Sequence, residues 1–287
     1  MGKIHDALEK AERSKELKVV PDIKPAPALR KPAASTVEVI PPAQVKSPSV
    51  QRRPETEYNR LDSKLVTYYD PGGVEAEIFK ILRTNILFPK AGSPPRSIMV
   101  TSAIPGDGKS FVAANLSISI AQGIEEYVLL MDCDMRRSTI HSQFGFADNT
   151  PGLSDYLAKN VPLKSLFKKT LIDKLTILPG GRTPSNPAEL LSSTAMKALL
   201  KETTARYRDR YVIVDSPPPH LTAETTALAQ YIDAIILVVR YGATPKELVT
   251  SLLEKLGKEK VIGVVMNGCR IPVTERYGYG KYKKYKK

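Results

Sequence analysis

Short apolar runs alternate with amphipathic segments along most of the chain. Nearly continuous aliphatic runs, which suit strands buried on both faces of a sheet, predict strands at residues 97–101, 127–132, 175–178, 211–215, 235–240 and 261–267. Apolar positions at helical spacing predict helices at residues 74–87, 109–122, 194–206, 222–230 and 246–256. This alternation favours an α/β fold, a doubly wound, mostly parallel sheet with helices on both faces.

The N-terminal part of the chain follows a different pattern. Residues 1–20 predict an amphipathic helix with Ile4 and Leu8 on its apolar face. Such a helix either docks on a partner or frays, because short isolated helices are marginal in water. Residues 21–60 contain eight prolines and no apolar period, which predicts a Pro-rich, disordered linker. The folded domain is expected over residues 61–274.

The composition is typical of a globular protein of a reducing compartment. Of all residues, 42% are hydrophobic and 25% charged, and there are two cysteines, Cys133 and Cys269. Two cysteines are too few for a disulfide framework. No apolar run approaches the ~20 residues that span a membrane, and the charged N-terminus lacks an apolar signal core. We therefore expect a cytoplasmic protein, and neither an integral membrane protein nor a secreted one.

Positive charge is concentrated at the C-terminus. The chain has a net charge of +13, and residues 275–287 alone hold six basic side chains and one acidic side chain. Four tyrosines lie in this tail, separated by Gly and Lys: Tyr277, Tyr279, Tyr282 and Tyr285. Because Gly and like charges oppose a stable helix or strand, we expect exposed hydroxyls suited to accept phosphate. Base stacking on single-stranded nucleic acid and attraction to anionic lipid are alternative uses of this tail.

The strongest chemical signal follows the first predicted strand of the sheet. Residues 99–110, MVTSAIPGDGKS, join a strand to a helix, which is the context of a phosphate-binding loop. The pattern departs from GxxxxGK[ST] at Ala103, which replaces the first glycine. Lys109 is expected to neutralise nucleotide phosphates, and Ser110 to ligate Mg²⁺. The residues expected to bind the nucleotide here are Pro105, Gly106, Asp107, Gly108, Lys109, Ser110 and Phe111.

Acidic side chains end two further predicted strands. Asp132 and Asp134 follow one strand, and Asp215 ends another. The carboxyl ends of parallel strands meet at one edge of a sheet, so these carboxylates should lie near the phosphates. We expect Asp132 and Asp215, with Ser110, to hold Mg²⁺ directly or through water. Asp132 or Asp134 is expected to accept a proton, which gives four catalytic candidates: Lys109, Asp132, Asp134 and Asp215.

Polar residues at later strand ends are weaker candidates. Arg240 suits phosphate contacts, as do Arg136 and Arg137, although a surface ion pair is as good an interpretation. Asn267 ends the last strand, and its amide suits the edge of an adenine. His141 is expected to pack or cap, and Cys133 to pack.

Together these motifs resemble those of the bacterial tyrosine kinases (BY-kinases) in their cytoplasmic, exopolysaccharide-associated form. The family's Walker A motif is similar to Thr101–Ser110, its Walker A′ motif to Leu129–Arg136 and its Walker B motif to Val212–Pro218. Two further stretches of the family are similar to Gly152–Leu157 and Asn186–Leu191. The resemblance covers about residues 73–287. It implies a MinD/ParA-like P-loop fold, a P-loop ATP-binding kinase domain at 61–274 and a tail whose tyrosines are autophosphorylated.

The resemblance also implies an assembly. The family's oligomerisation motif, E-x-x-R-x-x-R, is similar to Glu77, Lys80 and Arg83, with Lys80 in place of the middle Arg. Lysine lacks the bidentate fork of arginine. Ser138 stands where the family usually has Pro. Implied partners are further copies of the chain, in a ring when unphosphorylated, and a transmembrane polysaccharide chain-length regulator. That regulator would activate the chain and recruit it to the inner face of the membrane.

We therefore expect an ATP-dependent protein-tyrosine autokinase with ATP and Mg²⁺ as cofactors, acting in trans and regulating exopolysaccharide or capsule synthesis and export. No specific nucleic acid partner is expected. One alternative is a ParA/MinD-like switch ATPase with a basic DNA- or membrane-binding tail. Those proteins carry a signature Lys early in the loop, where this chain has Ile104. A third possibility is a nucleotide-gated scaffold whose N-terminal helix recruits assembly enzymes.

Overall fold

The computed structural model describes residues 60–205, 209–218 and 224–269. The chain divides into Met1–Gln51 and Arg52–Lys287, and the described residues belong to the second part. The expected N-terminal helix, nearly all of the Pro-rich linker and the tyrosine-rich tail lie outside the described residues.

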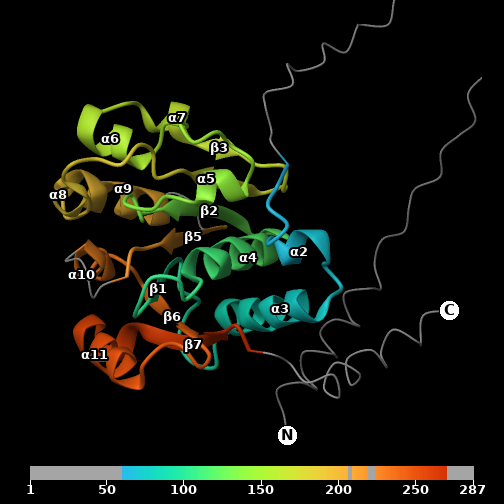
Figure 1. Ribbon diagram of the computed structural model, residues 1–287. Coiled ribbons are helices and arrows are strands. Elements are labelled where there is room, and N and C mark those ends of the chain that lie inside the picture. Colours follow the sequence, from blue (N-terminus) through green and yellow to red (C-terminus); the bar gives the residue numbers. More distant parts are fainter. Residues whose placement is uncertain (1–59, 206–208, 219–223, 270–287) are drawn as a thin grey trace, which may run out of the picture. The chain divides into compact units, whose positions relative to one another are not determined.

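One sheet organises the described part of the chain. Its strand order is β3-β4-β2-β5-β1-β6-β7, from top to bottom in Figure 1. The strands are β1 (Ser97–Ser102), β2 (Tyr127–Asp132), β3 (Lys168–Lys169), β4 (Leu175–Leu178), β5 (Arg210–Asp215), β6 (Ala234–Arg240) and β7 (Val261–Asn267). Every neighbouring pair is parallel except β3 with β4. The expected mostly parallel sheet is confirmed.

Of the described helices, two precede the first strand and the others lie in the connections between strands. They are α2 (Val66–Tyr69), α3 (Val74–Leu87), α4 (Lys109–Ala121), α5 (Ile140–Gln143), α6 (Leu153–Lys159), α7 (Leu163–Leu166), α8 (Pro187–Leu191), α9 (Thr194–Ala205), α10 (Glu224–Ala229) and α11 (Lys246–Leu256). A 3₁₀ turn, Lys258–Lys260, precedes β7. The long helices agree with the sequence prediction where the structure describes them. The prediction omitted α2, α5 to α8 and β3, because elements this short show no apolar period.

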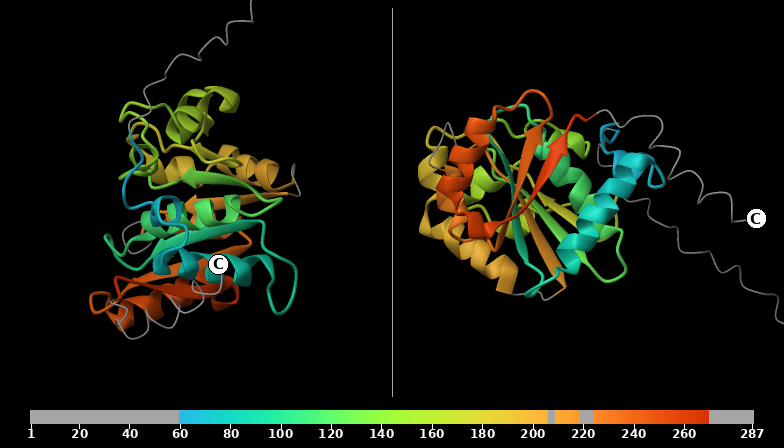
Figure 2. Two further views of the ribbon diagram at one scale, coloured as in Figure 1. Left: turned by 90° about the vertical axis from the view of Figure 1, so that its right-hand side faces the viewer. Right: turned by 90° about the horizontal axis from the view of Figure 1, so that it is seen from below.

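Two hydrophobic cores lie on opposite faces of the sheet. One joins α2, α3 and α4 to the sheet through side chains such as Phe79 and Leu116. The other joins the sheet to α6 and to α8 to α11 through side chains such as Met196 and Leu252. Figure 1 shows α2 to α4 on one side and α8, α10 and α11 on the other. In the right panel of Figure 2, the sheet runs between α3 and α11.

The edge strand β7 differs from the sequence expectation. We expected its aliphatic run to be buried on both faces, and this is wrong: its burial alternates, with Ile262, Val264 and Met266 being 49%, 53% and 56% exposed. Among the described strands β7 pairs with β6 alone, and Ile262 and Val264 line an open cavity that separates them from α3.

Helix α4 is the central buried element. Val112 to Ala121 are all buried, and Asn115 ties the helix to the start of the domain. Its side chain accepts a hydrogen bond from the Thr67 amide at 3.0 Å and donates one to the Lys64 carbonyl at 3.1 Å. No helix in the described part of the chain combines the length and apolarity needed to cross a membrane.

Candidate active site

The loop between β1 and α4 curls at the carboxyl end of the sheet. Gly106 and Gly108 have φ angles of +89° and +97°, which glycine adopts without steric cost. Ala103, in place of the pattern's first glycine, is buried and has no positive φ. A side chain is therefore accommodated there. Helix α4 begins at Lys109, so the unpaired N–H groups of its first turn suit an anion.

Side chains from distant segments hold this loop from outside. Thr244 Oγ1 donates a hydrogen bond to Asp107 Oδ1 at 2.7 Å, and Asn267 Nδ2 donates to the Asp107 carbonyl at 2.7 Å. Arg240 Nη1 donates to the Gly106 carbonyl at 3.2 Å. These partners lie 134 to 160 residues apart in the chain. The contacts of Asn267 to an adenine and of Arg240 to a phosphate stay predictions.

Lys109 points into a group of carboxylates. Its Nζ lies 2.8 Å from Asp134 Oδ2, and Asp134 Oδ1 accepts the Arg137 amide at 3.2 Å. Burial alone would lower the pKa of Lys109, but the charges of Asp215, Asp134 and Asp132 outweigh it and raise that pKa. Lys109 is therefore a firmly charged cation at the bottom of the loop.

The strand-end carboxylates lie level with each other. Asp132 of β2 pairs in register with Asp215 of β5, and both are fully buried. Burial raises the pKa of both groups, and mutual repulsion raises that of Asp132 further. The positive charge of Lys109 opposes the rise in the pKa of Asp215. The site thus concentrates negative charge that a cation would relieve.

These residues fit a metal-bound nucleotide. Neither carboxylate oxygen of Asp215 reaches a hydrogen-bond partner among the described residues, although both are buried. Such orphaned oxygens are costly unless a ligand satisfies them. Within the described ranges, no three His, Cys, Asp or Glu side chains converge to hold a metal by themselves. Mg²⁺ commonly uses one or two carboxylates together with substrate phosphates, which is the set available here.

A cavity of about 350 Å³ opens beside the loop. Its lining combines loop residues with the ends of β2 and β5: Pro105, Gly106, Lys109, Ser110, Asp134, Arg136, Arg137, Thr139, Pro217 and Pro218. Phe111 does not line it, because its ring packs edge-on against Phe79 of α3. Phe111 can offer a nucleotide its backbone N–H alone. Cys133 is buried, as expected.

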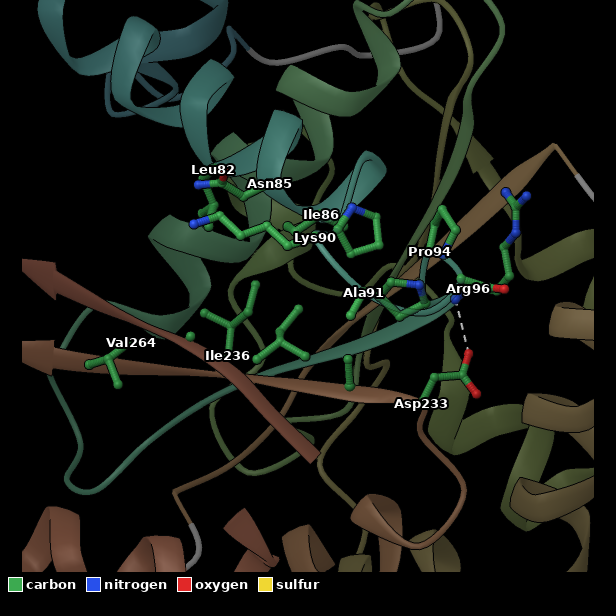
Figure 3. Close-up of a pocket in the computed structure, with 16 residues that line it drawn as sticks. Leu82, Asn85, Ile86, Lys90, Ala91, Pro94, Arg96, Asp233, Ile236 and Val264 are labelled. Atoms are coloured by element: carbon green, nitrogen blue, oxygen red, sulfur yellow. Dashed lines mark hydrogen bonds between the residues drawn. The ribbon is translucent and has the colours of Figure 1, made fainter. Parts of the chain in front are cut away.

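A larger cavity, about 740 Å³, lies away from these groups between α3, the segment before β1 and strands β6 and β7 (Figure 3). Aliphatic side chains such as Ile86, Ile236 and Val264 line it. Its carboxylate, Asp233, already accepts the amide of Arg96 at 3.0 Å. The cavity holds none of the phosphate-loop chemistry, so we place the active site at the smaller one.

The predicted oligomerisation residues lie on α3, away from the loop. Lys80 Nζ contacts Glu77 Oε1 at 2.7 Å and the Pro71 carbonyl at 2.7 Å. Arg83 Nη1 donates to the Ser119 carbonyl at 2.7 Å. All three side chains thus have partners within this chain, and their role in assembly stays a prediction.

Sequence reasoning missed two residues of the site. Thr244 could not be predicted, because nothing in the local sequence marks a threonine in a turn as a partner of a distant loop. Ser138 was noted only as a departure from a pattern, yet its Oγ donates to Asp132 Oδ2 at 2.8 Å. His141 packs beside it, with Nδ1 3.2 Å from Ser138 Oγ.

Known proteins are similar to this chain in sequence and fold. The AAA domain family matches residues 96–261. The chain is 37% identical over 223 residues to the tyrosine-protein kinase YwqD of Bacillus subtilis, covering 77% of this chain and 92% of that one. The chain belongs to the bacterial tyrosine kinases. This confirms the expected family and enzyme class.

Two further matches extend the comparison. The tyrosine-protein kinase wzc of Salmonella typhimurium is 34% identical over 225 residues; the match covers 77% of this chain but only 31% of that longer protein. The kinase domain of the Escherichia coli tyrosine kinase ETK superposes with a TM-score of 0.65 at 27% identity, covering 74% of this chain and 86% of that one. The expected MinD/ParA-like P-loop fold is confirmed.

Proposed function

We propose that this chain is an ATP-dependent autokinase that phosphorylates its own C-terminal tyrosines. The observation that carries the proposal is the ion pair of Lys109 and Asp134, 2.8 Å apart, beside Asp215, whose buried oxygens have no hydrogen-bond partner among the described residues. A phosphate-loop lysine can bind nucleotide phosphates, and the Asp215 carboxylate has oxygens available for a metal, and phosphoryl transfer uses both groups. Membership of a tyrosine kinase family supports this over the switch ATPase and the scaffold.

The residues of the site divide the work of transfer between them. When bound, Mg-ATP supplies the phosphoryl group and a metal that neutralises its charge. Lys109 would exchange Asp134 for phosphate oxygens, and the loop N–H groups would bind the phosphates beside it, including those of the departing ADP. Asp215 and Ser110 would hold the metal, and Asp132 would contribute Oδ1, which accepts fewer hydrogen bonds than Oδ2. Asp134, released from Lys109, accepts the phenol proton of the incoming tyrosine.

The proposed acceptors are Tyr277, Tyr279, Tyr282 and Tyr285 of a neighbouring copy. The surrounding Lys and Arg would attract the tail to the triphosphate. Each phosphate adds about −1.5 to −2 charges at neutral pH, so successive phosphorylation reverses the charge of the tail. We propose that this reversal loosens a ring held through α3.

We further propose that a transmembrane polysaccharide chain-length regulator activates the chain and holds it at the inner face of the membrane. This partner and a role in exopolysaccharide or capsule synthesis and export are what the BY-kinase resemblance implies. The expected N-terminal helix supports it, because a short amphipathic helix suits docking on a protein.

Peptide mass spectrometry of the full chain after incubation with Mg-ATP tests the activity. Lys109→Met should abolish phosphotyrosine, whereas Lys255→Met on the exposed side of α11 should leave it unchanged. The measurement is repeated with a regulator's cytoplasmic segment fused on. ATP hydrolysis without phosphotyrosine in both formats would overturn the proposal in favour of the switch ATPase.

Transfer between copies requires a second experiment. A chain with all four tail tyrosines changed to Phe keeps its site but lacks acceptors, and Lys109→Met keeps the acceptors but lacks the site. Phosphate on the Lys109→Met chain after mixing supports transfer in trans. No phosphate on it, while the wild type is modified, restricts transfer to within one copy.

A further inference from the structure

Ser138 holds one oxygen of the buried Asp132 carboxylate. Its Oγ donates to Asp132 Oδ2 at 2.8 Å, and the same oxygen accepts the amides of Thr139 at 3.1 Å and Ile140 at 3.2 Å. Asp132 Oδ1 accepts the Asp134 amide at 3.1 Å. Each carboxylate oxygen has two lone pairs, so Oδ2 is saturated and Oδ1 keeps capacity for a further ligand.

His141 holds Ser138 from the other side. The single hydroxyl hydrogen of Ser138 is given to Asp132, so toward His141 Nδ1, 3.2 Å away, the serine oxygen is the acceptor. This assigns a hydrogen to Nδ1. The His141 side chain is only 12% exposed, and its Nε2 lies 3.4 Å from the exposed Asp148 carboxylate. The ring therefore has little freedom to leave Ser138.

Gly180 leaves the space that this arrangement needs. A Cβ at Gly180 would lie 2.9 Å from Ser138 Oγ and 3.0 Å from Ser138 Cβ. A side chain at position 180 would therefore collide with Ser138 unless one of them shifted. The serine side chain thus lies between Asp132 and His141, and the missing side chain of Gly180 leaves room for it.

We propose that Ser138, oriented by His141, is a positioning residue that turns Asp132 Oδ1 toward the metal of the bound nucleotide. The inference rests on the proposed function. Without the hydroxyl, Asp132 Oδ2 loses its shortest hydrogen bond and keeps the amides of Thr139 and Ile140 at 3.1 and 3.2 Å, so the carboxylate is held less firmly about its terminal torsion, which is a broad one. The predicted signature is a raised Mg²⁺ requirement without loss of metal-free nucleotide binding.

The first test uses the full chain, fluorescent ADP as the probe, and titrations with Mg²⁺ or in EDTA. A hydrogen bond to a charged group is among the stronger ones in proteins, so Ser138→Ala should raise the Mg²⁺ concentration for half-maximal binding about ten- to a hundredfold. ADP affinity in EDTA should change less than about twofold. A merely structural role would weaken binding in both conditions.

Two variants serve as controls on the hydroxyl. Ser138→Thr keeps the oxygen and should restore the Mg²⁺ requirement to within about threefold of wild type. Ser142→Ala removes a neighbouring hydroxyl that donates to the Thr139 carbonyl at 2.9 Å and does not contact Asp132. It should leave the requirement unchanged.

Changes at His141 test its part in the arrangement. His141→Phe should raise the Mg²⁺ requirement about threefold, and His141→Asn, which keeps a donor near Nδ1, should recover it. The double change Ser138→Ala with His141→Phe should equal Ser138→Ala alone, because His141 acts through the serine. Additive effects would refute this order of action.

The outcomes separate this inference from the proposed function. If the wild type binds no Mg-ADP, both fail. If the wild type binds and phosphorylates tyrosine while Ser138→Ala keeps the wild-type Mg²⁺ requirement, only the positioning role fails. The expected kinetic counterpart is a lower kcat for Ser138→Ala with an unchanged KM for the tyrosine acceptor at saturating nucleotide.

Discussion

Replacing Thr244 by valine should detach the phosphate loop from its outer support while keeping the shape of the side chain. The hydroxyl donates to Asp107 Oδ1 at 2.7 Å and accepts the Arg240 amide at 2.9 Å. Asp107 is only 1% exposed, so water cannot readily replace the lost donor. Its other oxygen accepts the Ile104 amide at the long distance of 3.4 Å.

The structure sets the size of the expected effect. Leaving a buried acceptor unsatisfied costs about 1–3 kcal/mol, and more for a charged group. We expect Thr244→Val to lower the free energy of unfolding by about 2–3 kcal/mol. For a domain of this size, that corresponds to a fall in Tm of about 4–12 °C. Mg-ADP should bind about tenfold more weakly, because a less ordered loop must be fixed on binding.

Thermal unfolding and ADP titration of the full chain measure both effects. Thr244→Ser keeps the hydroxyl and should behave like wild type. Thr250→Val on α11 is the matched control, since that exposed hydroxyl donates only to the Lys246 carbonyl of its own helix. If Thr244→Val and Thr250→Val melt within about 1 °C of each other and bind ADP equally, the loop does not depend on this contact.

Three further predictions follow from other contacts. Gly108→Ala should lose most of its nucleotide affinity, measured by calorimetry, because φ is +97° there and the new Cβ would collide with Asn267 Nδ2. Adding Asn267→Ala to the Gly108→Ala chain should partly restore binding if the collision dominates, and should weaken it further if backbone strain at residue 108 is the cause. In EDTA, the pKa of Asp215 is raised to about 6, so between pH 4 and 6 the folded chain binds more protons than the unfolded chain and the free energy of unfolding falls as pH rises. Asp215→Asn should reduce the slope of the free energy of unfolding against pH, measured with urea, by up to about 1.4 kcal/mol per pH unit. Equal slopes for wild type and Asp215→Asn would contradict the raised pKa. Leu116→Ala in buried α4 should cost about 2–5 kcal/mol in urea unfolding, against less than about 0.5 kcal/mol for the half-exposed Ile78→Ala.

The sequence predicts the elements of this fold wherever burial imposes a period. Strands β2, β4 and β7 and helices α3 and α11 begin and end at the predicted residues. The short helices between β2 and β5 could not be found this way, because four to seven residues make at most two turns. The exposure of β7 was also hidden, since an aliphatic run does not reveal whether a helix covers the strand.

The site separates in the same way into local and distant parts. The loop from Pro105 to Ser110 is one continuous stretch of sequence, so its residues predict a phosphate site without knowledge of the structure. The register of Asp132 with Asp215 follows from their places at strand ends once the sheet is assumed. The loop's tethers and the contact of Ser138 with Asp132 depend on how separate segments meet, and no local pattern encodes them.

The strand order also sets the timing of folding during synthesis. Strand β1 precedes the phosphate loop, yet its hydrogen-bonded neighbours are β5 and β6, which come much later in the chain. The Ser97 amide donates to Asp233, which is made 136 residues later. Until those strands leave the ribosome, β1 is an apolar segment with two open edges, which invites aggregation. The loop is completed later still, when Asn267 reaches it. Nascent chains that stop before β6 should therefore be chaperone clients without nucleotide affinity, and the phosphate loop gains its last described tether only after residue 267 has been made.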